Sequence, residues 1–167
     1  MAVLRQLLLA LVRKRERPRA TVLSGSGATP QATLLALDRA GVAHLAAHGH
    51  HQAENALFST LELAGGPLLG YDLQRLAAVP SMVVLSTCDL GLSDLRPGDE
   101  TLGMVTALLS AGSATVVASV ARVADHTAMA AMVGYHREVT RGRRPAAALA
   151  AALQPHPGTG FVCFGTG

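Results

Sequence analysis

Three short, predominantly apolar runs constrain the fold of this chain more than any other feature. They cover residues 42–47, 82–86 and 114–120, and polar or turn-forming residues bound each of them. A strand that is buried on both faces has this character, whereas a strand with one face in water alternates between apolar and polar residues. Helix-length segments at 70–78 and 100–111 separate the runs. The pattern predicts an α/β fold with a mostly parallel sheet that helices cover on both faces.

Further elements are expected before, between and after these runs. Leu4, Leu8 and Leu11 lie at near-helical spacing, which predicts a helix over residues 3–16 that ends before Pro18. Thr29 and Pro30 suit the cap and first turn of another helix. The remaining expected elements are this helix through Ala40, a strand or hairpin arm at 57–64, helices at 126–140 and 145–154, and a short strand at 161–164.

The composition fits one folded domain. Half of the 167 residues are apolar and 15% are charged, so the chain has enough apolar side chains for a core. Aromatic residues make up only 3%, and there is no Trp, so Ala, Val and Leu must build that core. The net charge of +3 is too small to indicate a nucleic-acid partner. We expect residues 1–20 to form a helical, basic N-terminal segment and residues 21–167 to form the domain.

The cellular setting is predicted from the cysteines and the N-terminus. Two cysteines, Cys88 and Cys163, make neither a disulfide framework nor a complete zinc site. The apolar run near the N-terminus precedes its positive charges, which is the reverse of a secretory signal. No segment is as long as a membrane span. These observations predict a cytoplasmic protein with no membrane partner.

His48 and Cys88 each come directly after a buried-strand candidate. In an open α/β sheet, functional groups gather at the carboxyl ends of the strands. A thiol becomes nucleophilic when a neighbouring His takes its proton, which makes His48 a candidate base and Cys88 a candidate nucleophile. The backbone N–H groups of Gly49 and Cys88 could bind the oxyanion. Alternatively, Cys88 is a small buried hydrophobe and His48 simply makes a hydrogen bond.

Four segments in order resemble the CHAT domain, a relative of the caspase and separase peptidases. Residues 42–50 (VAHLAAHGH) resemble its strand and His-Gly signature, and residues 82–91 (MVVLSTCDLG) resemble its strand followed by Ser-small-Cys-acidic-x-Gly. Residues 98–125 are similar to its next helix, strand and terminal Asp, and FVCFGTG at the end is similar to its last strand. The usual Trp-Pro pair and a second Trp are missing. The resemblance covers about residues 21–167.

The resemblance implies a caspase-like three-layer α/β/α sandwich and a cysteine endopeptidase with His48 as base and Cys88 as nucleophile. It requires no cofactor, and its substrate would be a peptide or protein, with a sensor or other partner protein as a further expectation. A CHAT domain commonly has more strand and helix before the position of Thr21, which predicts a domain shortened at its N-terminal side with an exposed sheet edge. The alternative is a catalytically silent interaction or scaffold module.

Other signals have simpler explanations. Asp89 and Asp125 could receive a basic substrate side chain or could cap helices. His44, His48, His50 and His51 do not supply three converging ligands, so we predict no metal site. The glycines near residue 26 lack the motif of a phosphate- or nucleotide-binding loop, which argues against another doubly wound enzyme. Cys163 lies in an apolar run and is predicted to be a core residue.

Overall fold

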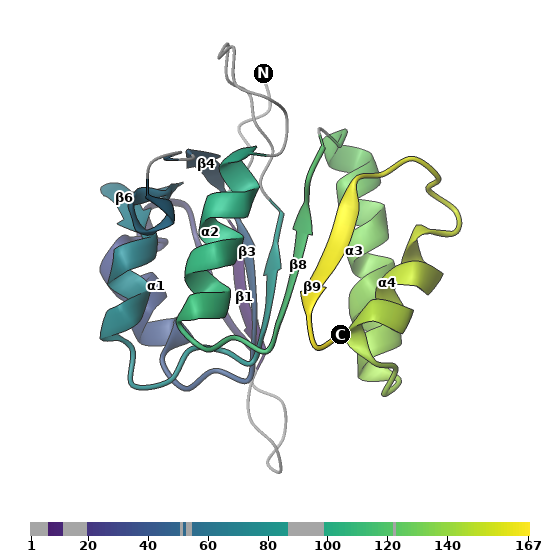
Figure 1. Ribbon diagram of the computed structural model, residues 1–167, viewed down its shortest axis with the longest axis horizontal. Helices are drawn as coiled ribbons and strands as arrows, with labels where there is room; N and C mark the ends of the chain where they lie inside the picture. Colours follow the sequence, from purple (N-terminus) through teal and green to yellow (C-terminus); the bar gives the residue numbers. More distant parts are fainter. Residues whose placement is uncertain (1–6, 12–19, 51, 53–54, 87–98, 122) are drawn as a thin grey trace.

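A computed structural model describes residues 7–11, 20–50, 52, 55–86, 99–121 and 123–167. These residues form a six-stranded sheet in the order β2-β1-β3-β7-β8-β9, with helices on both of its faces (Figure 1). The strands are β1 (Leu7–Leu11), β2 (Ala20–Ser24), β3 (Val42–Ala46), β7 (Met82–Leu85), β8 (Thr115–Ser119) and β9 (Phe161–Gly165). Four of these six described strands, β2, β3, β7 and β8, point in the same direction, and β1 and β9 run opposite to them. The predicted α/β sandwich with a mostly parallel sheet is confirmed.

The three apolar runs form the adjacent parallel strands β3, β7 and β8. Every residue of β7 and β8 is buried. Along β7 the side chains alternate between two cores: Val83 and Leu85 join one cluster, whereas Met82 and Val84 join the other. Successive side chains of a strand point to opposite faces, so a strand between two helical layers must be apolar throughout. This requirement explains why the runs show no alternation.

Two helices lie on each face of the sheet. On one face are α1 (Pro30–Leu37) and α2 (Asp99–Ser110), and on the other are α3 (Asp125–Thr140) and α4 (Pro145–Leu153). The predicted start of α1 is confirmed, because the Thr29 hydroxyl accepts a hydrogen bond from Ala32 N at 3.2 Å and Pro30 occupies the first turn.

The core contains few large side chains, as the composition predicts. Its principal aromatic residue is Tyr135, which is fully buried between α3 and the sheet and donates a hydrogen bond to Met82 Sδ at 3.2 Å. Around it, small residues of α3 and α4 such as Ala131, Ala148 and Ala152 let the helices lie close to the strands.

A small antiparallel sheet follows β3 at the upper edge of the main sheet in Figure 1. It comprises β4 (His48–His50), β5 (Thr60–Leu63) and β6 (Gly66–Leu69). The turn between β5 and β6 uses Gly65 and Gly66 at φ values of +84° and +141°, which suit glycine. Short 3₁₀ helices η1 (Gly25–Gly27), η2 (Ala56–Phe58) and η3 (Gly70–Arg75) complete the architecture. The hairpin arm predicted at 57–64 is confirmed, and the helix predicted at 70–78 is the 3₁₀ helix η3.

The helix predicted over residues 3–16 is wrong in its described part. Residues 7–11 form β1, which is antiparallel to β2 on one side and to β3 on the other. Short apolar runs are ambiguous between helix and strand. Here the backbone hydrogen bonds of both neighbouring strands favour the extended form. Residues 7–11 are therefore part of the main sheet rather than of a separate helical segment.

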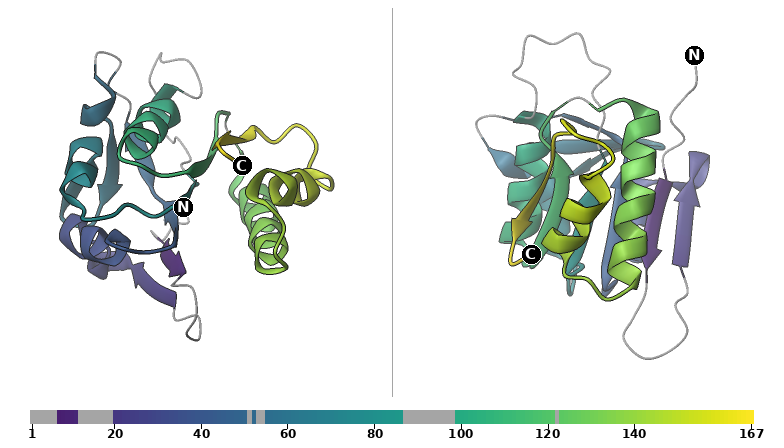
Figure 2. Two further views of the ribbon diagram at one scale, coloured as in Figure 1. Left: turned by 60° about the horizontal axis from the view of Figure 1, so that its bottom comes forward. Right: turned by 90° about the vertical axis from the view of Figure 1, so that its right-hand side faces the viewer.

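Strand β2 forms one edge of the main sheet and extends it beyond α3 (Figure 2). Four of its five residues are exposed, including Val22, whose exposed fraction is 51%. Within the part of the chain that the structure describes, no helix is long and apolar enough to cross a membrane.

Gly165, at the end of β9, is expected to be intolerant of substitution. Its φ is +93°, and a Cβ there would collide with the carbonyl oxygen of Ala114. Gly165→Ala should lower the free energy of unfolding by at least about 1–3 kcal/mol, the cost of a strained backbone position. Gly27→Ala is the matched control, since a Cβ at Gly27 meets no atom within 4 Å. Urea unfolding of both variants tests this, and equal stabilities would contradict it.

Candidate catalytic site at the carboxyl edge of the sheet

The pairing of β3 with β7 brings the chain segments of the predicted dyad to the same edge of the sheet. The two strands are parallel, and each β7 residue lies 40 positions after its β3 partner, from Val42↔Met82 to Leu45↔Leu85. Cys88 also lies 40 positions after His48. His48 begins β4 at the carboxyl end of β3, whereas Cys88 and Asp89 lie outside the described residues.

Strand β4 holds the described part of the predicted site. His48 lies opposite Glu62 in the antiparallel pair of β4 and β5, and Gly49 lies opposite Leu61. His48 and Gly49 are half-buried, whereas the side chain of His50 is 71% exposed. Residues directly opposite each other in an antiparallel pair have Cβ atoms about 4.5–5.5 Å apart. Glu62 is therefore a carboxylate next to the predicted base.

Glu62 was not identified from the sequence. Its Oε1 also lies 3.8 Å from Nε2 of His50, so the carboxylate is adjacent to both histidines of this face of β4. The only signal in the sequence was an acidic residue in a predicted strand. Such a signal does not show which residue of the neighbouring strand lies opposite it.

Asp125 is the first residue of α3 and is exposed. Helix α3 begins a few residues after β8 ends, so its first turn lies at the same edge of the main sheet as β4, the upper edge in Figure 1. Ala124 occupies the N-cap position, so Asp125 lies in the first turn of α3 rather than at its cap. A carboxylate in the first turn still stabilises a helix through the helix dipole.

A second group of polar residues lies at the end of β7, where sequence reasoning had not found a site. His44 Nε2 lies 2.8 Å from Ser86 Oγ, and His44 Nδ1 lies 3.0 Å from Nε2 of His136 on α3. These three side chains thus connect β3, β7 and α3. The available signal was the presence of His44 and Ser86 in apolar strands, because a buried polar side chain needs a partner.

Burial keeps this histidine pair neutral. Desolvation lowers the pKa of His44 to about 3, and the neighbouring His136 acts in the same direction. Desolvation also lowers the pKa of His136. The two rings are 5.1 Å apart between centroids, so a charge on His44 is disfavoured both by burial and by the neighbouring ring of His136.

Metal ligands do not converge in the described part of the chain. No group of three or more His, Cys, Asp or Glu side chains there could hold a metal ion. Among the predicted histidine cluster, His44 contacts His136, His50 lies near Glu62, and His51 is outside the described residues.

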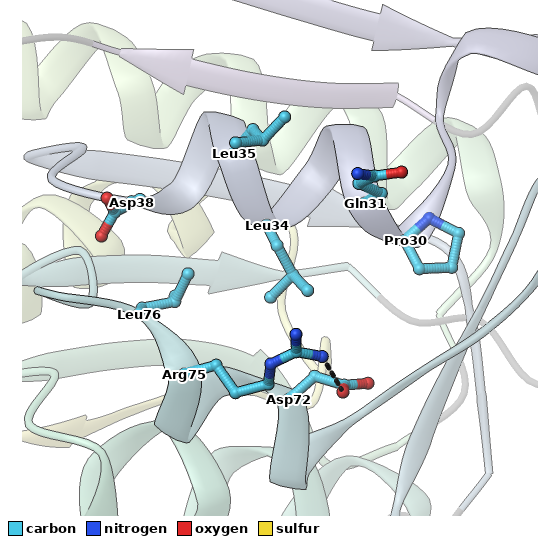
Figure 3. Close-up of a pocket in the computed structure, with 8 residues that line it drawn as sticks. All are labelled: Pro30, Gln31, Leu34, Leu35, Asp38, Asp72, Arg75 and Leu76. Carbon is cyan, nitrogen blue, oxygen red and sulfur yellow. Dashed lines mark ion pairs between the residues drawn. The ribbon is translucent and has the colours of Figure 1, made fainter.

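An open groove of about 490 Å³ lies between α1 and η3, on the face of the sheet opposite α3 (Figure 3). Leu34 extends from α1 towards Arg75, and none of the predicted site residues lines the groove. Both carboxylates that line the groove accept hydrogen bonds from backbone N–H groups. Asp38 Oδ1 accepts from Ala77 N at 2.9 Å, and Asp72 Oδ2 accepts from Leu69 N at 3.1 Å. The groove therefore offers no reactive group.

Acid should destabilise the fold through the buried histidine pair. Between pH 6.5 and about 3 the unfolded chain protonates His44, whereas the folded protein does not. The free energy of unfolding should therefore fall as the pH falls through this range, by up to about 1.4 kcal/mol per pH unit for this group.

A variant without the titrating group separates this effect from other acid effects. His44→Gln should have a shallower dependence of unfolding free energy on pH than the unchanged chain, measured by urea unfolding at several values between pH 4 and 7. The same slope in both proteins would show that His44 does not titrate in this way.

Comparison with known proteins places this architecture in a family. A search of curated proteins finds no significant match. The family model of the CHAT domain matches residues 2–155, which include β1, both helical layers and the strand ends described above. This match spans most of the 167 residues. With its helix-covered, mostly parallel sheet and its His-Gly segment at the sheet edge, the chain belongs to the CHAT domain family.

Proposed function

We propose that this protein is a cysteine peptidase in which His48 and Cys88 form the catalytic dyad. The observation that carries the proposal is the common interval of 40 positions, which separates both the β3–β7 strand partners and the two dyad residues. Three peptide units separate Cys88 from Leu85, so its Cα lies within about 10–11 Å of the end of β7. The proposal agrees with the family, whose relatives include caspase-like peptidases.

The chemistry would proceed by acyl transfer. The Cys88 thiolate attacks the carbonyl carbon of the scissile bond, and the C–N bond breaks as the His48 imidazolium gives its proton to the leaving amine. Water then attacks the thioester, its proton passes to His48, and the thiolate is released with the acid product. The N–H groups of Gly49 and Cys88 would stabilise the oxyanion in both steps. No cofactor takes part.

Glu62 supports the role of His48 as a base. As the residue opposite His48 in the β4–β5 pair, Glu62 can hold the imidazole in one orientation, as the carboxylate of a catalytic triad does. The side chain of Glu62 is 42% exposed, so water screens this interaction and its effect is modest.

The substrate is proposed to be a peptide or protein. Asp125, and Asp89 next to the nucleophile in sequence, would favour a basic side chain before the cleaved bond. The second candidate function is a silent interaction module, and the exposed edge of β2 favours it, because an edge strand can pair with a strand of another protein.

Peptide acyloxymethyl ketones that differ in the residue before the reactive group test the dyad. Such probes should label Cys88 covalently, with a preference for Arg or Lys. Cys88→Ala should abolish labelling, and His48→Ala should slow it by about 10²-fold or more, the usual contribution of a general base. Labelled residues are located by peptide mass spectrometry.

Cys163→Ala is the matched control for this experiment. Burial raises the pKa of the Cys163 thiol, so this residue should react slowly and its removal should leave labelling unchanged. If the unchanged chain does not label while circular dichroism shows it folded, the peptidase proposal fails and the interaction module becomes the better hypothesis. Equal labelling by acidic and basic probes would remove the proposed role of Asp89 and Asp125.

Glu62→Gln should lower kcat for a cleaved peptide about two- to fivefold, the range expected for an exposed ion pair. His50→Ala is the control, since it removes the other histidine beside Glu62. If Glu62 acts on His48, the loss caused by Glu62→Gln persists in the His50→Ala protein. A loss that disappears in that background would assign the effect to His50.

A further inference from the structure

The hydrogen-bonded residues Ser86, His44 and His136, which we term the polar chain, connect the end of β7 to β3 and α3. Two hydrogen bonds hold Ser86 in place. Its N–H donates to Leu45 O at 2.8 Å, which continues the pairing of β7 with β3, and its hydroxyl contacts His44 at 2.8 Å. Ser86 is therefore joined to β3 through both its backbone and its side chain.

The position of Ser86 bears directly on that of Cys88. Two peptide units connect these residues, so their Cα atoms are at most about 7 Å apart. A displacement of Ser86 must be absorbed within those two units. Within the polar chain, His44 contacts Ser86 and His136, whereas the predicted base His48 lies in β4 of the small sheet.

The polar chain also couples the tautomers of the two histidines. A neutral imidazole has one N–H donor and one acceptor nitrogen. If His44 donates from Nε2 to Ser86, its Nδ1 must accept from Nε2–H of His136. If Ser86 donates to His44, the Nδ1–H of His44 must donate to Nε2 of His136. Both histidines thus carry the proton on Nε2, or both carry it on Nδ1.

The ring of Tyr135 lies 5.5 Å from the ring of His136 in an edge-on arrangement, but the hydroxyl of Tyr135 takes no part in this coupling. Tyr135, the residue before His136, directs its hydroxyl to Met82 Sδ rather than to either imidazole. Burial raises the pKa of Tyr135, and nearby Cys163 adds to that effect, so the tyrosine stays neutral across the working range. The Cys163 thiol, whose pKa burial also raises, stays neutral at pH 7.

We propose that His44 and His136 are positioning residues that hold Ser86 at the end of β7 and thereby set where the segment bearing Cys88 begins. The effect on turnover rests on the proposed peptidase function, whereas the effect on the polar chain and on Cys88 reactivity does not. His136 is the member of the polar chain that lies on α3. It is the best position to test, because its replacement changes no residue of β3 or β7.

Three variants of α3 make the test. His136→Leu removes the contact with His44, and His136→Gln keeps both a donor and an acceptor and should rescue it. Tyr135→Phe is the matched control, since it removes a buried hydrogen bond of the same helix and keeps the aromatic ring that lies 5.5 Å from the ring of His136. Urea unfolding of all three shows which proteins are folded under the assay conditions.

The first measurement is long-range ¹⁵N–¹H NMR of the imidazoles in the full chain. In the unchanged protein and in Tyr135→Phe, His44 and His136 should show the same single tautomer. In His136→Leu, His44 should lose its fixed tautomer, and in His136→Gln it should regain one. Different tautomers at His44 and His136 in the unchanged protein would overturn the proposed chain.

The second measurement is the rate of iodoacetamide alkylation at Cys88, located by mass spectrometry, together with kcat and KM for a cleaved peptide. His136→Leu should change the alkylation rate and lower kcat by about ten- to hundredfold with little change in KM, as expected for a misplaced catalytic group. His136→Gln should recover most of the alkylation rate and most of kcat.

The outcomes separate the two proposals. If the unchanged protein cleaves nothing but Cys88 alkylation depends on His136 as described, the peptidase function fails and the positioning role stands. If alkylation and kcat in folded His136→Leu equal those of Tyr135→Phe, the positioning role is overturned, whether or not the protein is a peptidase.

Discussion

The in-register parallel pairing of β3, β7 and β8 is the constraint on which the rest of this structure depends. It requires strands that are apolar on both faces, and it therefore requires helices above and below them. The same pairing brings the carboxyl ends of the strands to one edge, where His48 begins β4 and where the segment with Cys88 leaves β7. Fold and candidate site thus share one physical cause.

A run of hydrogen-bonded polar side chains crosses the sheet at the end of β7, from Ser86 to His44 of β3 and on to His136 of α3. The four residues of β7, Met82–Leu85, have apolar side chains, and the hydroxyl of Ser86 directly after them is the first polar side chain of this run. A hydrogen bond in a low-dielectric interior is strong, and an unpaired polar group there is costly. Polar groups at this position therefore fix the geometry of the edge at little cost to the core.

Much of the fold could be predicted from the sequence because its signals are local. Short, predominantly apolar runs identified β3, β7 and β8, and Thr29-Pro30 identified the start of α1. Residues 7–11 could not be assigned, since a short apolar run is strand or helix according to its neighbours. His136 and Glu62 were missed because their partners are distant in sequence: His44 lies 92 positions from His136 and is reached only through the fold.

The parallel pairing also has a consequence for how the chain folds. Partners in β3 and β7 are 40 positions apart and those in β7 and β8 are 33 apart, so the central sheet consists of non-local contacts. Such contacts form slowly, because a long loop must close before they stabilise anything, whereas the β5–β6 hairpin and the α3–α4 pair are local. Until the sheet closes, Met82–Leu85 and Thr115–Ser119 are uncharged strand-forming segments exposed to other chains. Refolding at high protein concentration is therefore a competition between closing this sheet and intermolecular strand pairing.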